Sequence, residues 1–165
     1  MGPSSTIPAA IDALAVLLAA ALPESVQVLD GPAVGVALRT DHVIIGGDLD
    51  EDSVTGLQEA ASVGGQSRYE RYDVLLQVGA YASGGGAQKV VRDRAFGYLA
   101  AVEALLRENP RLEVVPGVPV VRNAQVGSRL DLDQRPPSAT NEAGEDVVLG
   151  RKAVITITVA CQARI

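Results

Sequence analysis

The sequence predicts an α+β fold: one domain over residues 1–165, with a mixed, mainly antiparallel sheet and two main helices packed on one face. Two observations support this prediction. Several segments alternate apolar and polar residues, as strands with one buried face do, and two longer segments carry apolar residues at helical spacing. A chain of 165 residues can form one self-standing core, which must be mostly aliphatic because it has one Phe, four Tyr and no Trp.

The first helix is expected over Pro8 to Leu22, with Ser5 or Thr6 as the N-cap and Pro8 tolerated in the first turn. The segment is too short to span a bilayer, and no Lys or Arg precedes it as in a signal peptide. We therefore expect a protein without a membrane segment.

Two short strands should follow, over residues 25–29 and 43–45, with weak pairing by residues 34–38 between them. An acidic run over residues 48–52 comes next. Residues 53–67 are polar and Gly-rich, which indicates a partly helical loop. We expect the whole stretch 48–68 to be exposed.

The central unit covers residues 67–109. Its strand places Leu76 and neighbouring apolar residues on one face and polar residues such as Gln77 on the other. A Ser-Gly-Gly-Gly joint over residues 83–86 leads into a helix whose apolar positions include Leu99, and Asn109-Pro110 ends it. This strand and helix should form the core.

The sequence after the second helix predicts two strands and the loop between them. A strand is expected over about Val118 to Leu130, and Pro119 suggests a sheet edge or a bulge. The polar stretch over residues 131–146 reads as an exposed loop. The last strand, Ala153 to Ala163, alternates clearly and points Cys161 inward as a small buried hydrophobe.

Charge and cysteine content argue against several kinds of binding site and against a disulfide. A net charge of −6 argues against a surface that holds nucleic acid by neutralising phosphates. A lone cysteine excludes an intrachain disulfide and a multi-cysteine zinc site.

Two motifs resemble ligand sites. Asp48, Asp50, Asp52 and Glu59 match the ligand spacing of a calcium loop, but Ser53 stands where the loop requires Gly, so an acidic loop that starts a short helix is favoured. The glycines over residues 79–86 lie between a strand and a helix, as in a phosphate loop, but no Lys followed by Ser or Thr comes directly after them. We expect neither a cofactor nor a metal.

Catalytic motifs are also weak. His42 is the only histidine and is expected at the edge of a loop, and Ser83 lacks the glycine context of a nucleophile elbow. These observations predict that the protein is not an enzyme.

The charged side chains favour a surface that contacts other protein subunits or solvent. Four arginines around the central unit indicate a solvated face or a salt-bridge surface between subunits more than a nucleic-acid site. The exposed charged residues that we expect at interfaces are Asp48, Asp50, Asp52, Arg68, Arg71, Arg92, Arg94, Arg129, Arg135 and Glu145.

Five segments follow one another along nearly the whole chain in a characteristic order: Leu22-Pro23, the run from Val26 to Pro32, the run from Val43 to Gly46, Arg71 to Val74, and the closing Ala163-Arg164-Ile165. In these segments and in the order of its elements, the chain resembles the tail-terminator (tail-completion) family of long-tailed phages. The segments are packing and turn motifs, and none is catalytic.

The resemblance implies a homohexameric ring that caps the tail tube, ends its polymerisation and offers a surface for joining the head. Its partners would be copies of itself, the tail tube protein and a neck protein, with DNA only passing through the ring. The protein would be assembled in the bacterial cytoplasm and reside at the tail-neck junction of the virion. Two alternatives remain: another neck or head-completion connector, and a small-ligand-binding domain or enzyme.

Overall fold

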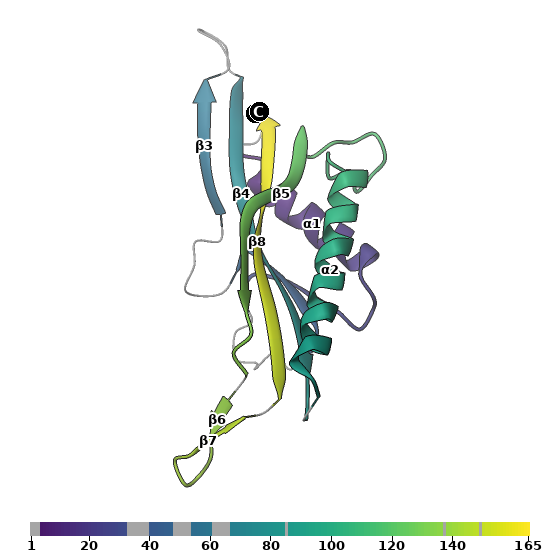
Figure 1. The fold of residues 1–165 in the computed structure, drawn as a ribbon. Coiled ribbons are helices and arrows are strands. Elements are labelled where there is room, and N and C mark those ends of the chain that lie inside the picture. Colours follow the sequence, from purple (N-terminus) through teal and green to yellow (C-terminus); the bar gives the residue numbers. More distant parts are fainter. Residues whose placement is uncertain are drawn as a thin grey trace.

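A computed structural model describes residues 4–32, 40–47, 54–60, 67–84, 86–136, 138–148 and 150–165. It has two helices and a mixed, mostly antiparallel open sheet, which confirms the predicted α+β fold (Figure 1). The elements in order are α1 (Ile7–Ala21), β1 (Gln27–Asp30), β2 (His42–Ile45), β3 (Val54–Ala60), β4 (Arg68–Ala82), α2 (Gln88–Glu108), β5 (Asn123–Asp133), β6 (Ser138–Thr140), β7 (Asp146–Val148) and β8 (Arg151–Arg164).

Two long antiparallel strands form the centre of the sheet. The strand order is β1-β2-β4-β8-β5, and β3 also pairs with β4. Strands β4 and β8 pair from Tyr69 opposite Arg164 to Ala82 opposite Arg151. Strands β2 and β3 share the other edge of β4, with β3 along its first half and β2 along its second. Only β1 and β2 pair in parallel within this described sheet.

Both helices lie on one face of this sheet (Figure 1). The buried side of α2 consists of Val91, Ala95, Leu99, Val102 and Leu106. It packs against the predicted apolar faces of β4 and β8, in which Leu76 and Ile157 are fully buried. The predicted core is therefore confirmed. Neither helix in the described part of the chain combines the length and apolar character needed to cross a membrane.

The predicted loop over residues 53–67 is wrong where it overlaps β3. Residues 54–60 pair with residues 74–68 of β4 as an antiparallel strand. Their sequence, Val-Thr-Gly-Leu-Gln-Glu-Ala, alternates poorly, and it is the free edge of β4 that makes them a strand. The short helix expected after the acidic run is excluded for the same residues. The pairing predicted for residues 34–38 and the acidic run over residues 48–52 lie outside the described residues.

Three further expectations need correction. Strand β5 begins at Asn123 and not at about Val118 as predicted. It is an edge strand, as expected from Pro119, and its register shifts between Val126 and Leu130, which corresponds to a bulge. The predicted loop over residues 131–146 contains the end of β5 and a hairpin of β6 with β7. His42 lies within β2 and is only 3% exposed, because it packs across Gly79 of β4.

Candidate interaction site

The end of the sheet near the C-terminus carries a cluster of arginines around one tyrosine. We call Arg68, Tyr69, Arg71, Arg122 and Arg164 the arginine rim. Tyr69 pairs in register with Arg164 across β4 and β8. The Cζ atoms of Arg122 and Arg164 lie 5.9 Å and 5.8 Å from the centre of the Tyr69 ring, within cation–π range. A shallow depression of about 140 Å³ lies between Tyr69, Arg71 and Arg122.

The rim has an excess of positive charge. Among the described residues, no rim arginine forms an ion pair with an acid. Arg164 donates to the Ser67 hydroxyl (2.6 Å) and Arg68 to the Gln58 amide oxygen (3.3 Å). Besides the buried Glu70, the register places two acids near the rim: Glu59 lies opposite Tyr69 on β3, and Asp73 lies two residues beyond Arg71 on β4. The rim is thus a surface able to accept acidic groups from outside the chain.

Glu70 anchors the start of β4 beneath this rim. It is 2% exposed, and its carboxylate accepts four hydrogen bonds. Ser5 Oγ (2.6 Å) and Gln58 Nε2 (2.8 Å) donate to Oε1, while the Thr6 backbone N–H (2.8 Å) and Thr6 Oγ1 (2.7 Å) donate to Oε2. Burial raises the pKa of Glu70, but these hydrogen bonds outweigh burial and hold it below its usual value.

The predicted cap of α1 by Ser5 or Thr6 is confirmed for the Ser5 side chain and is wrong for the Thr6 side chain. Thr6 occupies the N-cap position of α1, but its hydroxyl binds Glu70 and not the helix backbone. Ser5 Oγ accepts a hydrogen bond from the Ile7 N–H (3.1 Å). The carboxylate of Glu70, from a distant strand, supplies the negative charge that favours a helix N-terminus.

The opposite end of the molecule carries an acidic hairpin, which we define as residues 138–148. Strands β6 and β7 pair only with each other in the described chain and project beyond the sheet end where β8 begins (Figure 1). Asn141 Oδ1 orders the turn by accepting from the backbone N–H groups of Ala143 (3.0 Å) and Glu145 (2.9 Å). The hairpin sequence holds three acids, Glu142, Glu145 and Asp146, and no base.

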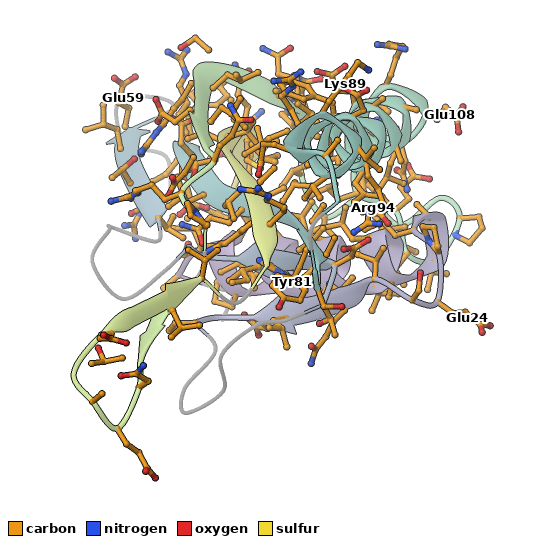
Figure 2. The ribbon with its side chains drawn as sticks, turned by 60° about the horizontal axis from the view of Figure 1, so that its bottom comes forward. Glu24, Glu59, Tyr81, Lys89, Arg94 and Glu108 are labelled. Atoms are coloured by element: carbon orange, nitrogen blue, oxygen red, sulfur yellow. The ribbon has the colours of Figure 1, made fainter. Side chains whose placement is uncertain are left out.

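The structure separates the arginines that the sequence grouped. Arg68 and Arg71 belong to the rim, whereas Arg94 on α2 donates to the Tyr81 carbonyl near the far end of β4 (Figure 2). Residues 71 and 81 are ten positions apart on β4, which corresponds to about 33 Å. Arg92 lies partly exposed on α2.

Arg94 belongs to a polar cluster that joins α2 to the start of β2. Its Nε lies 2.8 Å from Asp41 Oδ2, and the Tyr98 hydroxyl donates to the same oxygen (2.6 Å). The backbone N–H of Tyr81 donates to Asp41 Oδ1 (2.9 Å). Burial and the Asp41 carboxylate raise the pKa of Tyr98 to about 12. Arg94 Nε is buried without a well-aligned hydrogen bond, but the Arg94 guanidinium as a whole pairs with Asp41, and the cluster links α2 to β4 and to the start of β2. We therefore assign it a structural role.

Two of the remaining predicted site residues lie in or just after β5 and pair with acids of that strand. Arg129 pairs with Asp131 (2.6 Å) and Arg135 with Asp133 (2.9 Å). Glu145 lies in the acidic hairpin. Asp48, Asp50 and Asp52 lie outside the described residues.

The sites weighed from sequence motifs are placed as follows. Glu59, the last residue of the calcium-like pattern, lies on β3. Within the described ranges, no three His, Cys, Asp or Glu side chains gather in a way that would hold a metal ion. Gly79, the first residue of the phosphate-loop-like pattern, lies inside β4, where it faces the His42 ring.

Sequence reasoning missed Tyr69, Glu70, Arg122 and Arg164 as members of one region. The available signal was the antiparallel pairing of two long strands, because such pairing brings the start of β4 to the end of β8. Arg122 joins them through the segment before β5, whose backbone N–H donates to the Gln162 carbonyl (2.8 Å). No protein-family model matches the chain, and no curated protein matches it either.

Proposed function

We propose that the protein is a structural subunit of a phage virion that assembles into a ring, caps the tail tube and provides the surface that joins tail to head. One observation carries the proposal: the molecule presents two chemically opposite surfaces at its two ends, the arginine rim of the large sheet and the acidic hairpin that projects beyond that sheet (Figure 1). The resemblance in the order of elements to tail-terminator proteins supplies the specific role.

A ring subunit needs two different surfaces that fit each other. Such a head-to-tail contact closes into a ring when the rotation between neighbours allows it, whereas a twofold dimer uses the same patch twice. The rim and the hairpin are of opposite charge and lie at opposite ends of the molecule, which meets this requirement (Figure 1). Strands β3 and β5 also leave free edges among the described strands, which offer further surface for neighbours.

The test uses the phage whose genome encodes this chain. A stop codon in the gene should yield over-long tubes, or separated heads and tails, in electron micrographs, and a plasmid copy should restore normal particles. Normal virions without the protein would refute the proposal. A connector at the head is the second candidate, and binding of the labelled protein to isolated portal rings in place of tube ends would favour it.

A second experiment asks whether the hairpin takes part. Replacing residues 138–148 by a Gly-containing turn should change the melting temperature little, because loop length affects stability only slowly and the hairpin pairs with no other described strand. Particles complemented with this variant should still show the defects of the null mutant. A well-folded shortened protein that restores normal virions would remove the hairpin from the mechanism.

The third class, a small-ligand domain or enzyme, has its own test. Calorimetric titration and thermal melting with calcium, magnesium and ATP should give no response. A ligand present at a hundred times its dissociation constant would stabilise the fold by about 2.7 kcal/mol, a shift that melting detects readily. A reproducible rise in the melting temperature would favour the ligand-binding class.

A further inference from the structure

We infer that the acidic hairpin of one copy of this chain binds the arginine rim of a second copy, and that this contact is the repeating joint of the assembly. The inference rests on the proposed ring and names the surfaces that build it. It follows from three features: the unpaired arginines, the isolated hairpin, and the distance between them.

The arginine rim has binding capacity that its own chain does not use. Arg71 and Arg122 are exposed, make no ion pair with a described residue, and border the depression beside Tyr69. Glu70, directly below, is already satisfied by its own four donors. Guanidinium groups form their strongest hydrogen bonds with carboxylates, which makes an acidic protein segment the fitting occupant.

The acidic hairpin has the complementary properties. Residues 138–148 include three acids and no basic residue. Val147 and Val148 are 43% and 57% exposed. A two-stranded hairpin alone is marginally stable in water, so a partner that covers these valines and neutralises the acids would stabilise it.

The two surfaces of one chain lie too far apart to meet. Strand β8 runs from Arg151, next to the hairpin, to Arg164 in the rim. These residues are thirteen positions apart, or about 43 Å in extended conformation. Contact between hairpin and rim must therefore join two copies, and a rim and a hairpin remain free at the two ends of each pair to extend the assembly.

The test uses two charge-reversed variants of the full chain. The rim variant carries Arg71→Glu, Arg122→Glu and Arg164→Glu, all at exposed positions, and the hairpin variant carries Glu142→Lys and Glu145→Lys. In each variant alone, rim and hairpin have the same sign, so self-association should weaken at least about 30-fold, since like charges brought together cost several kcal/mol. The two variants mixed in equal amounts should co-assemble, because the acidic hairpin of the first fits the basic rim of the second and vice versa.

Sedimentation and mass photometry measure the assembly over a range of protein concentrations and at salt concentrations from about 50 mM to about 500 mM NaCl. Because salt screens exposed ion pairs, the assembly should weaken as the salt concentration rises. The matched control is Arg107→Glu, an exposed arginine of α2 outside both surfaces, which should assemble like the wild type. Circular dichroism and melting establish that every variant is folded.

Three results would overturn the contact: a rim variant that assembles like the wild type, a mixture that fails to restore assembly, or a wild-type chain that stays monomeric at all concentrations. Assembly that persists in the rim variant leaves the ring intact and rejects only this joint. Normal tails in the absence of the gene reject the ring function, whatever the variants do.

Discussion

Replacing Glu70 by Gln should destabilise the protein strongly although the side chain keeps its size. The carboxylate is 2% exposed and accepts four hydrogen bonds, two on each oxygen. An amide has one acceptor oxygen and one donor nitrogen. If its NH₂ group takes the place of Oε2, it faces the Thr6 backbone N–H, which can only donate. If it takes the place of Oε1, the Gln58 amide can accept from it only by flipping, which breaks the bonds of Gln58 to the Ser4 carbonyl and to Arg68.

The magnitude follows from these contacts. One buried donor left without an acceptor costs about 1–3 kcal/mol. Loss of the negative charge at the N-terminus of α1 costs about 0.3–1 kcal/mol more. The free energy of unfolding should therefore fall by about 2–3 kcal/mol, which for a domain of this size lowers the melting temperature by about 4–12 °C.

The effect should depend on pH with a definite sign. Because the pKa of Glu70 is lowered in the folded protein, its contribution is fully present above the unfolded pKa and is lost as pH falls through the lower folded pKa. The unfolded pKa is about 4.3. The difference in unfolding free energy between wild type and Glu70→Gln should be constant around neutral pH and shrink in strong acid.

Urea denaturation at neutral pH and at several acidic pH values measures both quantities. Glu59→Gln is the matched control, because Glu59 is exposed on the adjacent β3 and should change stability by less than about 0.5 kcal/mol. A Glu70→Gln variant as stable as wild type would show that the four hydrogen bonds contribute nothing. A difference that stays the same from neutral to strongly acidic pH would refute the assigned charge state.

Three further predictions concern the core. Gly79→Ala should lower the free energy of unfolding, measured by urea denaturation, by about 1–3 kcal/mol, because the new Cβ would lie 2.3 Å from His42 Cε1. Adding His42→Ala to this variant should recover part of the loss. If the effects of the two substitutions were strictly additive, the predicted clash would be contradicted. Cys161, 1% exposed with its pKa raised by burial to about 12, should react with a thiol reagent only after unfolding, so fast labelling of the native protein would refute its placement. Leu76→Asp should abolish folding by circular dichroism, whereas Gln77→Glu, on the other face of β4, should fold normally.

The sequence alone determined the buried faces of the long elements. Alternation in β4 and β8 and helical spacing in α2 identified Leu76, Leu99 and Ile157 as core residues, and all three are buried. This prediction succeeds because side-chain direction in a strand or helix depends only on local backbone geometry, and every residue of a long periodic segment repeats the same signal.

Only the tertiary structure decided the state of β3, the burial of Glu70 and the composition of the arginine rim. Residues 54–60 become a strand because β4 offers a free edge, not because of their own pattern. A carboxylate on the core face of β4 is tolerated only because Ser5 and Thr6, distant in sequence, bring donors to it. Arg122 and Arg164 join Arg71 through strand register, and register depends on pairing between segments whose individual sequences do not specify each other.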